Sequence, residues 1–223
     1  MFNKLLKIFL HILSGIFLLS TVTGCTQKTL QNEASPLPAS DTNQVQSSQP
    51  ITPSPTGLLT APISHALERV TKKSLGTKVS PQNSPVTPEK FSGYHTGVDF
   101  ETFPDEQNID VPIYVVCTGP LLRKEVVSGY GGIAVQQCTL ENQTVTVLYG
   151  HLKLTSITVQ GGKILNAGEQ LGILGKGYSS ETSGERKHLH LGIHKGPSIN
   201  IRGYVNNPSE LDAWLDVTKY LSR

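Results

Sequence analysis

Short apolar runs, several of them alternating with polar residues, dominate the second half of this chain. The runs cover residues 112–116, 121–127, 131–138, 144–152 and 169–175, and glycine, proline and asparagine separate them. Alternation with period two places successive side chains on opposite faces of a β-strand. Several short strands at this spacing predict an antiparallel β-sandwich or barrel-like sheet. We therefore expect a mainly β domain over residues 88–223.

One further run, residues 188–194, reads HLHLGIH and alternates histidine with aliphatic residues. On a strand, the three aliphatic side chains would face the core, and the opposite face would carry His188, His190 and His194. Neighbours on one face stand about 7 Å apart, so one imidazole could bind a metal ion while the next reaches a molecule bound beside it. The alternative is a solvated face that happens to be rich in histidine.

The C-terminal stretch, residues 207–221, has a different pattern. It reads NPSELDAWLDVTKYL, and its apolar residues recur at helical spacing. Ser209 is placed to cap such a helix. We expect a short C-terminal helix that packs on the sheet and carries no chemistry.

The N-terminus has the features of a bacterial lipoprotein signal. Residues 1–24 combine two lysines, an apolar run and small residues, which is typical of a secretory signal peptide. A single-pass membrane anchor is the alternative, although the apolar run is short for a span of about 20 residues. Residues 22–25, VTGC, resemble a lipobox. That resemblance implies cleavage before Cys25, lipidation of Cys25, and an extracytoplasmic protein anchored to a bacterial membrane in the cell envelope.

Two segments separate this signal from the β domain. Residues 25–57 are rich in Ser, Thr, Pro and Gln and hold few large apolar groups, so we expect a disordered tether. Residues 58–87 form an entry segment that could hold a short helix or a strand. The sequence leaves open whether residues 58–90 cover a groove and inhibit the domain.

Charge and cysteine content narrow the function further. Residues 1–24 contain two lysines and no acidic residue, so their removal lowers the number of Lys and Arg from 19 to 17. This number equals the 17 Asp and Glu, and the mature chain is close to neutral. It therefore lacks the positive surface charge that nucleic-acid binding needs. Apart from Cys25, the chain has two cysteines, Cys117 and Cys138. Because the environment outside the cytoplasm is oxidising, we expect these two to form a disulfide. The alternative is two buried free thiols. The sequence does not define the oligomeric state.

Three short motifs occur in order along the predicted β domain. They are HTGVD at 95–99, YGHL at 149–152 and HLH at 188–190. His95 and Asp99 would lie about 13 Å apart on a straight strand, and a turn at Gly97 could bring them together. Each motif is weak alone. Together, over residues 88–196, they resemble the lysostaphin-like (LytM-type) zinc metallopeptidases that cut peptidoglycan peptides. The glycine-spaced run at 159–177 is part of this resemblance.

The resemblance implies a role for five residues. His95, Asp99 and His190 match the family's three ligands to a single zinc ion (Zn²⁺). His151 and His188 match its two active-site histidines that do not bind metal. The implied activity is endopeptidase cleavage of stem peptides or cross-bridges in peptidoglycan, for remodelling or lysis of the cell wall.

The residue types suit this chemistry. A catalytic zinc ion keeps three protein ligands and one open position, and it lowers the pKa of water to about 7. No HExxH glutamate is present, so the two free imidazoles would move protons and stabilise charge. The sequence does not say which of them is the general base.

Two segments depart from the family pattern. Residues 101–114 form a longer link than usual after the first motif, and GERKHLHLG at 184–192 replaces the commoner Gly-Pro before and Phe-Glu after the last motif. Some family members have lost zinc ligands and activate other wall hydrolases without being enzymes. A non-catalytic, wall-binding regulatory module is therefore the alternative function, although every ligand position is filled here.

Overall fold

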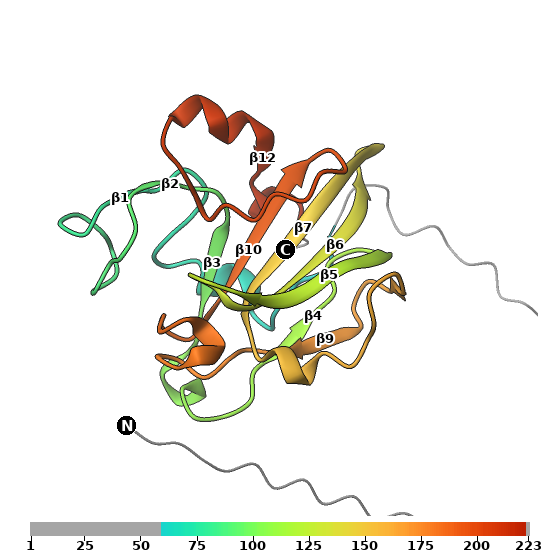
Figure 1. Cartoon of the computed structure of the whole chain (residues 1–223), viewed down its shortest axis with the longest axis horizontal. Coiled ribbons are helices and arrows are strands. Elements are labelled where there is room, and N and C mark those ends of the chain that lie inside the picture. Colours follow the sequence, from blue (N-terminus) through green and yellow to red (C-terminus); the bar gives the residue numbers. More distant parts are fainter. Residues whose placement is uncertain (1–58, 222–223) are drawn as a thin grey trace, which may run out of the picture. The chain divides into compact units, whose positions relative to one another are not determined.

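The structure is a computed structural model that describes residues 59–221 (Figure 1). The predicted signal peptide at 1–24, the lipidation site Cys25 and the tether at 25–57 lie outside the described residues. Within residues 59–221, no helix is both long and apolar enough to cross a membrane.

A seven-stranded antiparallel sheet forms the centre of the domain. Its strands follow the order β12-β10-β7-β6-β5-β8, and β3 pairs with the first half of β10, on the same edge as β12. The mainly β, antiparallel fold predicted from the sequence is confirmed, with strands at the expected places. The bounds are β3 (Val98–Glu101), β5 (Gly119–Val127), β6 (Gly131–Leu140), β7 (Gln143–Leu152), β8 (Ile164–Leu165), β10 (His188–Lys195) and β12 (Trp214–Leu215).

Two smaller sheets and several short 3₁₀ helices complete the domain. One sheet contains β1 (Lys78–Val79), β2 (Gly93–His95) and β11 (Tyr204–Val205), and the other pairs β4 (Pro112–Tyr114) with β9 (Gln170–Ile173). The 3₁₀ helices are η1 (Ala66–Arg69), η2 (Pro104–Glu106), η3 (Leu154–Ser156), η4 (Ser180–Thr182), η5 (Pro208–Ala213) and η6 (Val217–Lys219).

Strand β10 separates the core from the histidine face as its alternation predicts. Leu189, Leu191 and Ile193 are at most 1% exposed and belong to the main hydrophobic cluster. His188 and His190 point to the other side of the sheet, yet they are only 2% and 3% exposed. The interpretation of this face as a solvated surface is therefore wrong for these two histidines, because other segments cover them.

Residues 59–87 pack into the same hydrophobic core as the sheet. Leu59, Ile63 and Ala66 belong to the main cluster, and Leu59 forms a bridge with Leu221. The segment contains both a short 3₁₀ helix, η1, and a short strand, β1, so each of the two expected elements is present in part. Its apolar side chains explain why it folds onto the domain instead of extending the tether.

The C-terminal stretch differs from the prediction. A short helix, η5, is present, but it ends at Ala213, and the expected continuation of the helix to Leu221 is wrong. Trp214 and Leu215 instead form β12, whose pairing with β10 buries the Trp214 indole. Asn207, not Ser209, precedes the first turn.

Cys117 and Cys138 are bonded to each other in the structure, with their Cα atoms 6.0 Å apart. Cys117 lies two residues before the start of β5, and Cys138 lies in β6, the strand that pairs with β5. The bond therefore joins two neighbouring segments of one sheet, and its Cα separation is ordinary for a disulfide.

Replacing both cysteines, Cys117→Ala with Cys138→Ala, is expected to lower the free energy of unfolding by about 3 kcal/mol. The bond spans a separation of 21 residues and restricts the unfolded chain. Urea unfolding of the parent and the double variant measures the difference. A reducing agent should destabilise the parent and leave the variant unchanged. Equal stability of parent and variant would show that the bond does not form in the native protein.

Candidate metal centre

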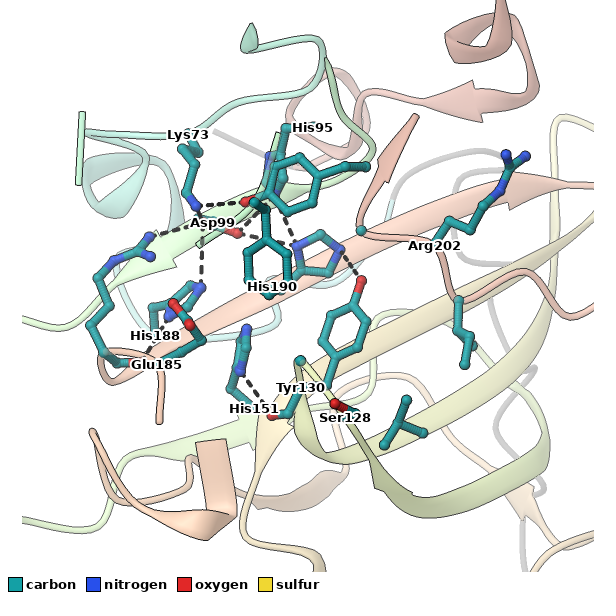
Figure 2. Close-up of a pocket in the computed structure, with 17 residues that line it drawn as sticks. Lys73, His95, Asp99, Ser128, Tyr130, His151, Glu185, His188, His190 and Arg202 are labelled. Atoms are coloured by element: carbon teal, nitrogen blue, oxygen red, sulfur yellow. Dashed lines mark hydrogen bonds and ion pairs between the residues drawn. The ribbon is translucent and has the colours of Figure 1, made fainter. Parts of the chain in front are cut away.

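An open pocket of about 300 Å³ lies over the histidine face of the central sheet (Figure 2). The five residues singled out by the sequence motifs all line it: His95, Asp99, His151, His188 and His190. The structure thus brings together side chains from three separate parts of the chain. His194, the last histidine of β10, does not line this pocket, and its ring packs edge-on against Trp214 at 4.9 Å.

A tight turn between β2 and β3 brings His95 to Asp99. Nε2 of His95 lies 3.2 Å from Oδ1 of Asp99, as expected for a turn at Gly97. A Cβ atom at Gly97 would come within 2.7 Å of the His190 ring. Glycine is needed here because the backbone passes directly beside a third member of the site.

Sheet register then adds His190. In the antiparallel pairing of β10 with β3, His190 stands directly opposite Asp99. Its Nδ1 lies 3.0 Å from Nε2 of His95 and 3.2 Å from Oδ1 of Asp99. The three atoms therefore form a nearly equilateral triangle. Ligands at normal zinc distances in a tetrahedral site stand about 3.3 Å apart, so this triangle fits one zinc ion.

The outer hydrogen bonds of both histidines leave the metal-facing nitrogens free. Nδ1 of His95 lies 3.2 Å from the Ser74 carbonyl oxygen, which can only accept, so the proton is on Nδ1. Nε2 of His190 lies 3.4 Å from the Tyr130 hydroxyl. A hydrogen bond on the far nitrogen is the usual arrangement for histidines that bind metal.

His151 and His188 lie beside this triangle with their rings 4.3 Å apart. Each donates its Nδ1 proton to a backbone carbonyl, His151 to Tyr130 at 2.8 Å and His188 to Arg186 at 2.9 Å. The neutral His151 imidazole therefore carries its lone pair on Nε2. His151 also has a φ of 65°, a left-handed conformation that is uncommon for residues other than glycine.

Burial and charge set the protonation of the site. Burial, together with the neighbouring His188 and His190, holds the pKa of His151 well below its usual value. Burial also lowers the pKa of His190 to about 4. For Asp99, burial would raise the pKa, but the charges of His95 and His188 and hydrogen bonds to histidine hold it well below its usual value. At neutral pH the site therefore offers an anionic Asp99 carboxylate and neutral His151 and His190 imidazoles, and metal binding needs ligands in these deprotonated forms.

The sequence interpretation missed several residues that complete the site. Lys73 and Ser74 precede the first motif, and their carbonyl oxygens accept from the Asp99 backbone N–H at 2.8 Å and from the His95 ring. Tyr130 and Arg186 contact His190 and Asp99. Arg186 lies in a stretch already recognised as a departure from the family pattern, but nothing in the sequence places it against Asp99.

Comparison with known proteins finds one matching family profile and several similar solved structures. The profile of peptidase family M23 matches residues 93–203. The catalytic domain of the antimicrobial peptidase lysostaphin from Staphylococcus simulans is 19% identical, with a TM-score of 0.47, and the match covers 69% of this chain and 93% of that one.

Two longer proteins are also similar. Helicobacter pylori Csd3 is 18% identical with a TM-score of 0.46, and the match covers 75% of this chain but only 36% of Csd3. A zinc-containing peptidase from Vibrio cholerae is 22% identical with a TM-score of 0.39, covering 60% of this chain and 35% of that one. A comparison with curated proteins found no match.

The M23 profile spans all three motifs, from His95 to His190. This match confirms the lysostaphin-like resemblance read from those motifs. Through residues 93–203, the chain belongs to peptidase family M23, with a LytM-type peptidase domain.

Proposed function

We propose that the chain is a zinc-dependent endopeptidase that hydrolyses peptide bonds in the stem peptides or cross-bridges of peptidoglycan. In this proposal His95, Asp99 and His190 hold one zinc ion per chain. The observation that carries it is the triangle of ligand atoms, with sides of 3.0 to 3.2 Å, at a pocket that two further imidazoles also line. The complete ligand set favours an enzyme over a non-catalytic regulatory module.

Two residues beside the metal would transfer protons and stabilise charge during hydrolysis. When bound, zinc supplies Lewis acidity that activates water and polarises the scissile carbonyl. Among residues 59–221, no hydrogen bond engages Nε2 of His151, so His151 can accept a proton. Nε2 of His188 instead contacts Oδ2 of Asp99 at 3.3 Å. We therefore assign His151 as the general base and His188 as the group that stabilises developing charge.

Replacing His151 or His188 by alanine is expected to lower kcat by roughly 10²–10⁴-fold, the usual contribution of a proton-transfer group. Neither residue belongs to the ligand triangle, so zinc affinity should change little. Steady-state kinetics and zinc competition with a chromogenic chelator measure the two quantities. His194→Ala, on the same strand but outside the pocket, is the matched control and should keep parental kcat. Parental kcat in His151→Ala would rule out the assignment of His151 as base.

The cellular setting of this activity is part of the proposal. Peptidoglycan lies outside the cytoplasmic membrane, which agrees with the signal peptide at 1–24, lipidation at Cys25 and the tether at 25–57. A lipid anchor would keep the domain, placed at residues 88–223 with 58–87 as its entry segment, within reach of the wall.

Digestion of purified peptidoglycan tests the proposal. The protein is incubated with crosslinked peptidoglycan of several chemotypes, and released fragments are identified by mass spectrometry. New amino termini should appear with zinc, disappear with a chelator, and return when zinc is restored. The fragments would also identify the cleaved bond. A folded, zinc-loaded protein that releases nothing from any chemotype would refute the proposal.

A further inference from the structure

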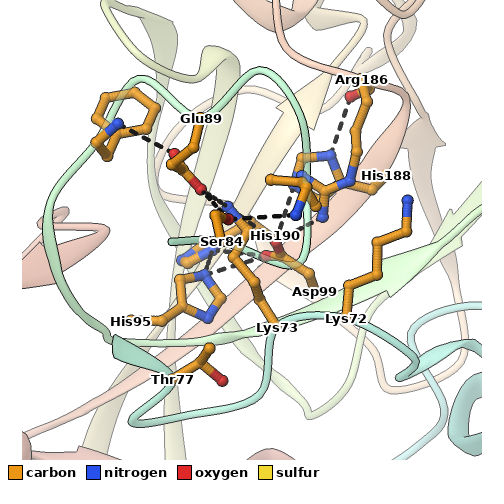
Figure 3. A network of polar contacts seen from close by, with 12 residues as sticks. Lys72, Lys73, Thr77, Ser84, Glu89, His95, Asp99, Arg186, His188 and His190 are labelled. Carbon is orange, nitrogen blue, oxygen red and sulfur yellow. Dashed lines mark hydrogen bonds and ion pairs between the residues drawn. The ribbon is translucent and has the colours of Figure 1, made fainter. Parts of the chain in front are cut away.

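The two oxygens of the Asp99 carboxylate face different partners (Figure 3). Oδ1 lies 3.2 Å from the metal-facing nitrogens of both His95 and His190. Oδ2 accepts a hydrogen bond from Nη2 of Arg186 at 2.8 Å, and it has Nε2 of His188 at 3.3 Å and Nζ of Lys73 at 3.9 Å. One oxygen thus belongs to the ligand triangle, and two cations hold the other.

Both cations make further contacts that hold them in place. Arg186 donates through Nε to Glu101 at 2.9 Å, and Nη2 contacts the same carboxylate. Lys73 is 3% exposed, pairs with Glu89 at 3.1 Å, and donates to the Tyr204 hydroxyl at 2.7 Å. Side chains anchored on two sides cannot move away from Asp99 without leaving charges unpaired in the interior.

The two segments that depart from the family pattern meet in this network. Glu101 begins the long link after the first motif, and Arg186 precedes the last motif. Strand pairing places them at one end of the β3–β10 ladder, where His188 stands opposite Glu101. An ion pair between Glu101 and Arg186 joins the two segments.

We propose that Arg186, supported by Lys73, is a positioning residue that retains Oδ2 of Asp99 and so makes Asp99 a one-oxygen ligand. This inference rests on the metal centre of the proposed function. A carboxylate can bind a metal ion through one oxygen or through both. With Oδ2 retained by Arg186, only Oδ1 is presented beside the two histidine nitrogens. The fourth tetrahedral position then stays open, as a catalytic zinc site requires.

The test compares two full-length variants in detergent that differ only at residue 186: Glu101→Gln, and Glu101→Gln with Arg186→Met. The shared Glu101→Gln change avoids a Glu101 carboxylate that pairs only with the exposed Lys72, at 3.6 Å, when Arg186 is removed. Each protein is loaded with Co²⁺ for d–d absorption spectra and with Zn²⁺ for X-ray absorption. Thermal unfolding checks that both are folded. Arg202→Gln changes another arginine that lines the pocket but pairs with Glu210 instead of Asp99, and it serves as the control.

Glu101→Gln and Arg202→Gln should keep the strong Co²⁺ bands of a four-coordinate site. The double variant should bind metal but show weaker bands and one additional oxygen at zinc, because Oδ2 is released. Identical spectra in both Glu101 variants would overturn the proposal. Loss of metal from a folded double variant would also overturn it, since Arg186 would then be needed to hold Asp99 in place at all.

These outcomes are separate from failure of the proposed function. A parent protein that binds Co²⁺ and Zn²⁺ but hydrolyses nothing would refute the endopeptidase and leave the role of Arg186 intact. A parent that binds neither metal would refute both.

Discussion

Changing His190 to alanine is expected to abolish zinc binding and peptidoglycan hydrolysis together while leaving the fold in place. His190 supplies one corner of the ligand triangle, and its Nδ1 is the atom nearest to His95 and Asp99. Altering even an outer partner of a metal ligand costs about 10–100-fold in affinity, so losing a ligand should cost more. The imidazole is neutral at pH 7, because burial lowers its pKa to about 4, so its removal leaves a cavity and no new unpaired charge on the strand.

Zinc competition and fragment release measure the two losses, and thermal unfolding measures the fold. His188→Ala, two residues earlier on β10, is the matched comparison because it should lose activity but retain zinc. If His190→Ala bound zinc as tightly as the parent, the metal would have to lie elsewhere.

Deleting the chain before residue 88 is expected to destroy the folded domain and its metal site. Leu59, Ile63, Val79 and Val86 are buried, and each aliphatic side chain contributes about 1.5–3 kcal/mol, against a total stability of about 5–15 kcal/mol for a domain. The lost segment also supplies the carbonyl oxygens that bind the Asp99 N–H and the His95 ring. Circular dichroism, urea unfolding and zinc binding measure the loss.

A chain that begins at residue 50 is the matched control for this deletion. It lacks the predicted signal peptide and most of the tether but keeps every residue that the structure describes. We expect it to fold, bind zinc and hydrolyse peptidoglycan. A chain from residue 88 that folds and is more active than this control would instead make residues 58–90 a removable inhibitory cover.

Local patterns predicted much of the fold. The β-strands follow from alternation that the core enforces, because Leu189, Leu191 and Ile193 can be buried only in one register. The predicted C-terminal helix is too long, because the apolar residues of 207–221 recur at helical spacing although the helix ends at Ala213. Burial of Trp214 through strand pairing with β10 outweighs that local preference.

The candidate site was predictable where its side chains carry a motif and unpredictable where they do not. His95, Asp99 and His190 stand in short motifs of recognisable spacing, and a turn glycine and the register of β10 bring them together. The Ser74 carbonyl is a backbone group that any residue could supply. Arg186 and Asp99 are 87 residues apart in the sequence, so their contact depends on the tertiary fold and not on a local motif.

The chemical consequence of the structure is a division of roles within one small cluster. Three atoms are spaced for a metal ion, two further imidazoles line the same pocket, and two cations hold the second carboxylate oxygen of Asp99. The outer contacts come partly from residues 59–92, before the stretch that the family profile matches. Both parts therefore contribute contacts to the candidate metal centre.

Zinc dependence of the proposed endopeptidase is best measured by titrating zinc into the metal-free protein while following peptidoglycan hydrolysis. Activity should rise in proportion to added zinc, reach its maximum at one equivalent per chain, and be absent in chelator. Hydrolysis that persists without metal would contradict the proposed function, as would one tightly bound zinc ion with no hydrolysis of any peptidoglycan chemotype.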